Sequence, residues 1–323
     1  MEVSKKEKIR KLIVFIAGQN IIYWVFLLLI LFFAITLGKT FFSAQNLMNI
    51  LRQTAMLSIM AVGMTFALAA GEIDLSAGSV IALSGCVTAM ALREFNLVIA
   101  LLIGIGAGII VGVFNGFIVA KLRIPSFLVT LASMGIIGGL TRWITSLKSI
   151  GISNLTYIYF FGSGNVGPIP VLFIWTLIIL IIGVLLLNKT SYGKRLLATG
   201  GNEKAAFFTG IKTRWVKMSA LIISATSAAF AGMLYVGRLQ GARYSIGEDL
   251  ILSVIAAAVL GGTSLFGGKA TVLGSLIGAI VIGIINNGLI LMGLDISQQM
   301  FFRGIILLIA ISINIRTHLK SKI

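Results

Sequence analysis

The chain has 323 residues, of which 58% are hydrophobic and 11% are charged. A soluble domain carries about a quarter charged residues, so this composition excludes an ordinary soluble protein. Apolar stretches of about 20 residues recur along the chain without the sustained alternation of barrel strands, which predicts an all-α polytopic membrane protein. Basic cytoplasmic loops account for the net charge of +17 without a nucleic-acid partner.

Ten transmembrane helices are predicted within a single transmembrane domain, residues 1–323. Their approximate limits are 21–37, 54–70, 76–92, 97–120, 126–146, 171–188, 218–237, 250–262, 271–292 and 299–315. The basic segment "MEVSKKEKIRKL" precedes the first span, and no small-residue cleavage site follows that span. We therefore expect the first span to be retained as a helix.

The distribution of Lys and Arg predicts that both termini are cytoplasmic. In that orientation 18 of the 26 Lys and Arg residues fall in inner segments. These segments are the tail 1–20, the turns 121–125 and 263–270, the loop 189–217 and the C-terminal tail. On the outside, residues 39–53 are amphipathic and are expected at the membrane interface. Residues 147–170 form an extracytoplasmic loop.

The stretch "ALAAGEIDLSAGSVIAL", 67–83, places two carboxylates between apolar runs. Ionisable residues at membrane depth are functional candidates. The residues Gly71, Glu72, Asp74 and Ser76 also have the composition of a helix break, in which Gly71 ends one helix and Asp74 or Ser76 caps the next. A structural cap, a role in a gate or substrate path, and a proton or sodium site are the three interpretations.

Glycines recur every four residues in several predicted spans, and each such face lets helix backbones approach closely in lipid. The positions are Gly104, Gly108, Gly112 and Gly116, then Gly135 and Gly139, and Gly274 and Gly278. Three asparagines at membrane depth, Asn115, Asn286 and Asn287, either join helices through hydrogen bonds or line a path for a polar solute. The glycine spacing predicts a tightly packed bundle.

The sequence contains no pattern typical of an enzyme. The single cysteine, Cys86, lies in an apolar run, and the single histidine, His318, lies in the polar tail, so no metal site or cofactor is expected. The segment "GGTSLFGGKAT", 261–271, lacks the spacing of a phosphate-binding loop. It is expected to form a tight turn between helices.

The inner loop contains "GGNEKAAFFTGI", 200–211, in which good helix formers follow a candidate Asn cap. This segment resembles the coupling segment of permease subunits from ribose-type sugar ABC importers. Two further stretches also resemble that family, "AVGMTFALAAGEIDLSAGSVIALSG" at 61–85 and "IAAAVLGGTSLFGGKATVLGSLIGAIVIGIINNGLILMG" at 255–293. The likeness extends over nearly the whole chain.

The resemblance implies a ten-span permease of a bacterial inner membrane that works in pairs, as a homodimer or with a related permease. A cytoplasmic ATPase would dock on the coupling segment, and an extracytoplasmic binding protein would deliver a monosaccharide. The matching coupling residues are Asn202, Glu203, Lys204, Ala205, Ala206 and Gly210. Asp74 matches the family's break between the second and third spans, whereas Glu72 stands where the family commonly has Gly.

Ribose is the first substrate suggested by this resemblance, but two departures leave the solute open. One is the stretch "TSLKSIGIS" after the fifth span, where the family's polar stretch is altered. The family often has an acidic pair where this chain has Ile251 and Ser253, while Glu248 and Asp249 lie slightly earlier. Other sugars, polyols, nucleosides and branched-chain amino acids therefore remain alternatives. Two further readings are an ion-coupled secondary transporter that uses Glu72 and Asp74, and a membrane scaffold that transports nothing.

Overall fold

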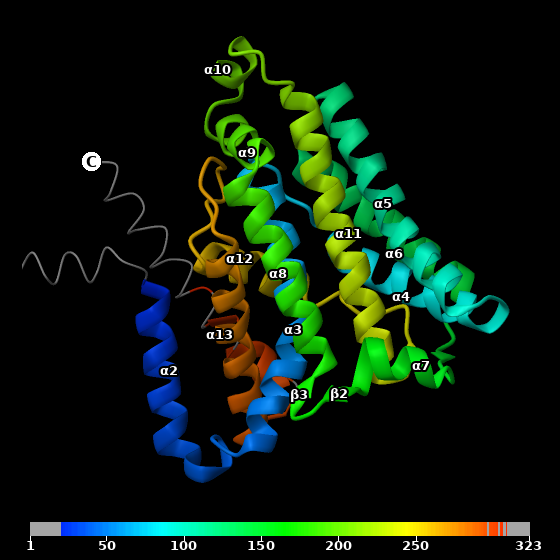
Figure 1. Ribbon diagram of the computed structural model, residues 1–323, viewed down its shortest axis with the longest axis vertical. Coiled ribbons are helices and arrows are strands. Elements are labelled where there is room, and N and C mark those ends of the chain that lie inside the picture. The colour runs from blue at the N-terminus through cyan, green and yellow to red at the C-terminus, as the bar shows by residue number, and fades with distance from the viewer. Residues whose placement is uncertain (1–20, 296, 303, 306–307, 309–323) are drawn as a thin grey trace, which may run out of the picture.

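The computed structural model describes residues 21–295, 297–302, 304, 305 and 308, which form an elongated bundle of helices (Figure 1). The long helices are α2 (Ile21–Leu37), α3 (Ala44–Ala69), α4 (Ala77–Glu94), α5 (Leu97–Leu122), α6 (Ser126–Thr145), α8 (Val171–Lys189), α11 (Thr213–Leu239) and α13 (Val272–Leu291). The shorter ones are α7 (Leu155–Ile158), α9 (Ser191–Gly201), α10 (Glu203–Phe208) and α12 (Ile251–Leu260), with the helical turns η1 (Gly38–Thr40) and η2 (Tyr159–Ser163).

The strands belong to the loops at one end of the bundle. β1 (Ile150–Gly151) pairs antiparallel with β4 (Gly241–Ala242), so that Ile150 lies opposite Ala242. β2 (Asn165–Val166) and β3 (Ile169–Pro170) form a second antiparallel pair. Tyr157 lies fully buried in the same loop and donates a hydrogen bond to the Met233 carbonyl at 2.7 Å. The predicted extracytoplasmic loop is therefore packed onto the helices.

Among the described residues, six helices are long and apolar enough to cross a membrane, namely α3, α5, α6, α8, α11 and α13. The predicted spans 21–37, 76–92 and 250–262 correspond to α2, α4 and α12. α12 has only 10 residues. The predicted tenth span, 299–315, lies largely outside the described residues, as do the tail 1–20 and His318. The class of all-α membrane protein is confirmed.

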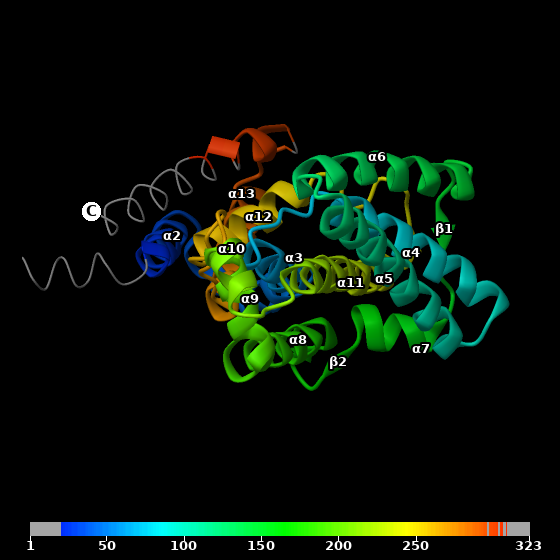
Figure 2. The same cartoon turned by 90° about the horizontal axis from the view of Figure 1, so that it is seen from above.

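Helices α3 and α11 form the centre of the bundle (Figure 2). Of the 18-residue apolar stretch in each helix, 83% is buried in α3 and 67% in α11, but only 28% in α5. α5 packs on α11 through its glycine face, where an added Cβ at Gly108 would lie 2.8 Å from the Ala225 carbonyl oxygen and one at Gly112 would lie 2.6 Å from the Ile222 Cα. The predicted close packing of this face is confirmed.

The other two glycine pairs behave differently from one another. Gly274 and Gly278 of α13 pack against the backbone of α12 and its end, at Gly261 and Ala257. Gly135 and Gly139 of α6 are exposed, and an added Cβ would meet no atom within 4 Å. The prediction of packing within the chain is therefore wrong for α6, because these glycines face outward.

Residues 39–53 do not form a separate segment at the interface, because α3 begins at Ala44 and continues unbroken. Ser43 caps this helix by accepting a hydrogen bond from the Asn46 N–H at 3.2 Å. The polar residues that made the segment look amphipathic have protein partners. Asn46 bonds to Asn287, and Arg52 donates to the Asn165 Oδ1 at 2.8 Å. Most of the segment is therefore the first part of α3, and its place at the outer interface stays a prediction.

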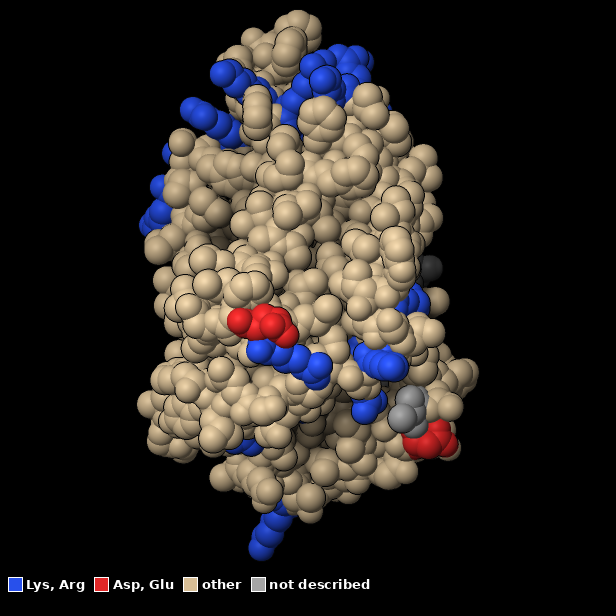
Figure 3. All heavy atoms as spheres, turned by 90° about the vertical axis from the view of Figure 1, so that its right-hand side faces the viewer, with Lys and Arg blue, Asp and Glu red and all other residues tan. Residues whose placement is uncertain are grey.

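The two ends of the bundle differ in composition. α10 projects at one end and α7, β2 and β3 lie at the opposite end (Figure 1). Lys and Arg side chains gather at the α10 end (Figure 3). The exposed basic residues of the segments at that end are Lys121, Arg123, Lys189, Lys194, Arg195, Lys204, Lys212, Arg214 and Lys269. The loops 147–170 and 189–217 thus lie at opposite ends, as the alternation of predicted spans requires.

Candidate coupling site

The loop 189–217 folds into α9 and α10, and its last residues begin α11. Asn202 caps α10, because its Oδ1 accepts a hydrogen bond from the Ala205 N–H at 3.0 Å. Gly210 follows the helix at φ +86°, a left-handed conformation that favours glycine. The Ile211 N–H then bonds to the Ala206 carbonyl at 3.1 Å. The short helix predicted behind an Asn cap is confirmed.

The surface of α10 combines polar and aromatic side chains. The exposed members of the predicted coupling set are Asn202, Glu203, Lys204, Ala205 and Gly210. Ala206 is only 5% exposed, so it packs inside the chain and supports the helix. Sequence reasoning missed Phe207 and Phe208, which are 63% and 85% exposed. Two adjacent Phe residues in a polar loop were the available signal, because exposed aromatics mark binding surfaces.

Backbone contacts hold the base of this site against the bundle. An added Cβ at Gly200, near the end of α9, would lie 1.9 Å from the Ala69 carbonyl oxygen at the end of α3. The same carbonyl accepts a hydrogen bond from the Gly268 N–H at 3.1 Å. Gly267 and Gly268 have φ +83° and +76°. The tight turn predicted for 261–271 is confirmed, and its Gly267 and Gly268 lie against the backbone at the end of α9, just before α10.

A side-chain contact joins α9 to α11. The hydroxyl groups of Tyr192 and Ser219 are 3.0 Å apart. Burial raises the pKa of the Tyr192 phenol, and its hydrogen bond to Ser219 opposes that change. The phenol is therefore neutral at physiological pH and keeps its proton for hydrogen bonding. This contact fixes the direction in which α9 leaves α8.

The segment between α3 and α4 is a helix break held by several hydrogen bonds. Gly71 ends α3 at φ +79°. Asp74 is completely buried, and its Oδ1 accepts hydrogen bonds from the Ser76 N–H at 3.1 Å and the Ser76 hydroxyl at 2.6 Å. Thr130 of α6 accepts a bond from the Leu75 N–H at 3.1 Å. These contacts favour the structural interpretation of Asp74, a carboxylate at the start of α4.

Glu72 lies in an ion-paired cluster that the sequence analysis missed. The Lys217 Nζ is 2.8 Å from the Glu72 Oε1 and 2.6 Å from the Glu203 Oε2. The Glu72 side chain is 6% exposed and that of Lys217 is 20% exposed. A lysine in a basic loop carries no signal of its partner, so only the folded chain brings Lys217 to both carboxylates.

A groove of about 1040 Å³ opens between the break and α10. Its walls come from segments 71–73, 119–127, 203–208 and 213–217. Its charged lining residues are Arg123, Lys204, Arg214 and Lys217, with Glu72 and Glu203. The groove is therefore net positive, and these four segments meet around it.

The asparagines predicted at membrane depth separate into different roles. Asn115 donates to the Ser76 hydroxyl at 2.9 Å and so supports the break. Asn287 exchanges two hydrogen bonds with Asn46, at 3.1 and 2.9 Å, and only 3% of it is exposed. Asn286 is half-buried. Asn115 and Asn287 thus make hydrogen bonds of the kind that the first interpretation expects, and a solute path along the three asparagines stays a prediction.

Replacing Asn287 by Leu is expected to lower stability by about 1–2 kcal/mol, because Asn46 loses a partner while it stays buried. The double variant Asn46→Leu/Asn287→Leu is expected to lose less than the sum of the two single changes. Thermal unfolding in detergent measures both effects, and Asn286→Leu serves as the neighbouring control. Additive losses in the double variant would contradict the pairing.

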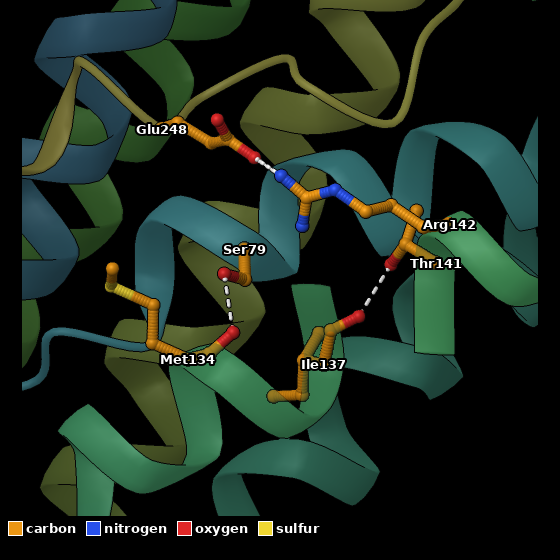
Figure 4. Close-up of polar contacts among 6 residues, drawn as sticks. All are labelled: Ser79, Met134, Ile137, Thr141, Arg142 and Glu248. Carbon is orange, nitrogen blue, oxygen red and sulfur yellow. Dashed lines mark hydrogen bonds and ion pairs between the residues drawn. The ribbon is translucent and has the colours of Figure 1, made fainter. Parts of the chain in front are cut away.

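At the other end of α6, Arg142 extends toward Glu248 in the segment between β4 and α12 (Figure 4). The two side chains form an ion pair and are 41% and 43% exposed. Ser79 of α4 donates to the Met134 carbonyl at 2.9 Å, which ties α4 to α6 (Figure 4). An exposed pair adds little stability, so its main effect is to orient Glu248.

Comparison with known proteins places the chain in a family. Residues 46–311 match the family described as branched-chain amino acid transport system / permease component. The chain belongs to this permease family. The permease is 39% identical to the ribose import permease of Bacillus subtilis (strain 168), over 85% of this chain and 86% of that protein.

Two further relatives cover most of the permease. It is 38% identical to the ribose import permease of Haemophilus influenzae, over 88% of this chain and 90% of that protein. It is 31% identical to the xylose transport system permease of Escherichia coli (strain K12), over 91% of this chain and 90% of that protein. No solved structure matches the chain. The matched region of the permease includes the break, α10 and the groove.

Proposed function

We propose that this permease is the transmembrane subunit of an ABC importer in a bacterial inner membrane, and that its solute is a monosaccharide. The ribose and xylose permeases among its relatives support a sugar, and ribose is the first solute to test. The observation that carries the proposal is α10, an exposed helix at the basic end of the bundle (Figure 1), which follows directly on α9, where Gly200 lies against the backbone of α3.

In the proposed assembly, two permeases form one pathway between them, as two copies of this chain or one copy with a related permease. Each crosses the membrane ten times and has cytoplasmic termini. An extracytoplasmic binding protein delivers the sugar, and a cytoplasmic ATPase contacts Asn202, Glu203, Lys204, Ala205 and the two exposed Phe side chains. Hydrolysis of ATP takes place on the partner, so this chain needs no catalytic residue.

The backbone contacts at the end of α9 support transmission of a rigid-body movement from α10. A displacement of α10 is transferred to the end of α9, where Gly200 touches the backbone of α3 and of the α12–α13 turn. Close backbone contacts leave no room for the helices to slip, so a small movement at the ATPase interface shifts whole spans. The break at 71–76 is the natural place for α3 and α4 to change their relative angle.

The two carboxylates give less support to ion-coupled transport. Such a mechanism needs a carboxylate that binds and releases an ion during the cycle. Glu72 is ion-paired with Lys217, and Asp74 accepts two hydrogen bonds at the start of α4. Both groups therefore have structural partners already. The family membership also favours the ABC importer.

The test is recovery of partners from the native membrane. The tagged chain is purified in mild detergent, and the proteins that accompany it are identified by mass spectrometry. We expect an ATP-binding subunit, and a binding protein that can then be titrated with ribose and xylose. Recovery of the chain alone, together with uptake that survives ATP depletion but stops when the ion gradient collapses, would overturn the proposal.

A further inference from the structure

One lysine connects three separate segments around the groove. Lys217 lies in the second turn of α11, Glu203 begins α10, and Glu72 belongs to the break between α3 and α4. The Lys217 Nζ lies within 2.8 Å of a carboxylate oxygen of Glu72 and of one of Glu203. A cation held between two carboxylates is a stronger link than a single surface pair, because removing it leaves two like charges facing each other.

Burial makes this cluster more than a solvated surface pair. Glu203 is 47% exposed, but Glu72 is 6% exposed, and a buried carboxylate depends on a paired counter-charge. Lys217 provides that counter-charge. The two acidic residues belong to different segments that line the groove, one to segment 71–73 and the other to segment 203–208. Lys217 therefore links α10 to the break.

We propose that Lys217 is a positioning residue that makes α10, the start of α11 and the α3–α4 break move as one body during transport. The inference rests on the proposed function, in which α10 receives the movement of the ATPase. The contact of Gly200 with the end of α3 transmits the movement from α9 into α3. The ion pairs of Lys217 transmit it from α10 directly into the break. Glu72, where this chain departs from the family pattern, is what makes the second path available.

The first test separates transport from hydrolysis. The permease is reconstituted in proteoliposomes with its co-purified ATPase and binding protein, and ribose uptake is measured against ATP consumed. We expect Lys217→Met to keep ATPase docking and hydrolysis while ribose carried per ATP falls about fivefold. Lys212→Met removes a charge from an exposed residue outside the groove and should leave the ratio unchanged.

Two further variants guard against simple misfolding. Lys217→Met leaves Glu72 buried without a counter-charge, so Lys217→Met/Glu72→Gln should recover thermal stability yet keep the low ratio. The swapped pair Glu72→Lys/Lys217→Glu leaves Glu203, a proposed ATPase contact, unchanged, and it should transport better than Lys217→Glu alone. A ratio equal to wild type in Lys217→Met, or no rescue in the swapped pair, would overturn the inference.

The second test needs neither sugar nor partner. Spin labels at Ile73→Cys and Phe208→Cys report the distance across the groove in the purified chain in nanodiscs. Lys217→Met is expected to widen the distance distribution, and Lys212→Met is not. An unchanged width in Lys217→Met would overturn the inference even where ribose carried per ATP falls. Failure to recover an ATPase would instead overturn the proposed function. The width of the spin-label distance distribution would still decide whether Lys217 holds α10 to the break.

Discussion

Gly112→Val is expected to destabilise the permease by about 3 kcal/mol, the upper range for overpacking, and to lower its melting temperature by several degrees. An added Cβ at Gly112 would lie 2.6 Å from the Ile222 Cα of α11, which is backbone and cannot turn away. The two helices would have to separate at the centre of the bundle. Thermal unfolding and the monodisperse fraction in detergent measure the loss.

The matched control lies on the same helix. An added Cβ at Gly106 meets no atom within 4 Å, so Gly106→Val should change stability by less than about 0.5 kcal/mol. Both substitutions add the same apolar atoms to α5, and only the direction of the side chain differs. Equal melting temperatures for the two variants would mean that α5 and α11 do not pack closely in the membrane.

Phe208→Ala is expected to weaken docking of the ATPase about thirtyfold, which corresponds to about 2 kcal/mol for a central aromatic contact. Phe208 is 85% exposed at the tip of α10, so it contributes little to the fold. Transport should fall with docking, while expression and melting temperature stay close to wild type. Titration of the immobilised permease with the purified ATPase measures the dissociation constant.

Trp143→Ala provides the control for this prediction. Trp143 is 81% exposed in the last turn of α6, at the end opposite to Ser126, which lines the groove. Loss of this aromatic side chain should leave docking unchanged. If Phe208→Ala binds the ATPase as tightly as wild type does, the ATPase does not use the tip of α10, and the coupling role must lie elsewhere in the loop 189–217.

The accuracy of the sequence-based limits follows from local signals. The predicted span 97–120 corresponds to α5, which Asn96 caps through a bond from the Ile99 N–H at 3.0 Å. The predicted span 171–188 corresponds to α8, which follows Pro170. In both places a strong apolar run meets a residue that starts a helix by its own chemistry. The Asn202 cap and the glycine turn at 261–271 were predictable for the same reason.

What the sequence did not show has a different cause. Asn46 and Arg52 make residues 39–53 look amphipathic, but no local pattern indicates that these side chains bond to residues far away in the chain. Gly135 and Gly139 repeat the spacing of the glycine face on α5, yet they point outward. Spacing defines a helical face without saying what lies against it. The neighbour across that face depends on how all the helices are arranged.

The sequence by itself determined the class of protein, the positions of most helices and the existence of a capped helix in the basic loop. These properties depend on hydrophobic runs and on residues within one or two turns of each other. Only the tertiary structure decided that Lys217 joins Glu72 to Glu203, that Gly200 rests on the end of α3, and that Phe208 is left exposed. Such contacts join segments that are distant in the chain, and the packing of the whole bundle selects them.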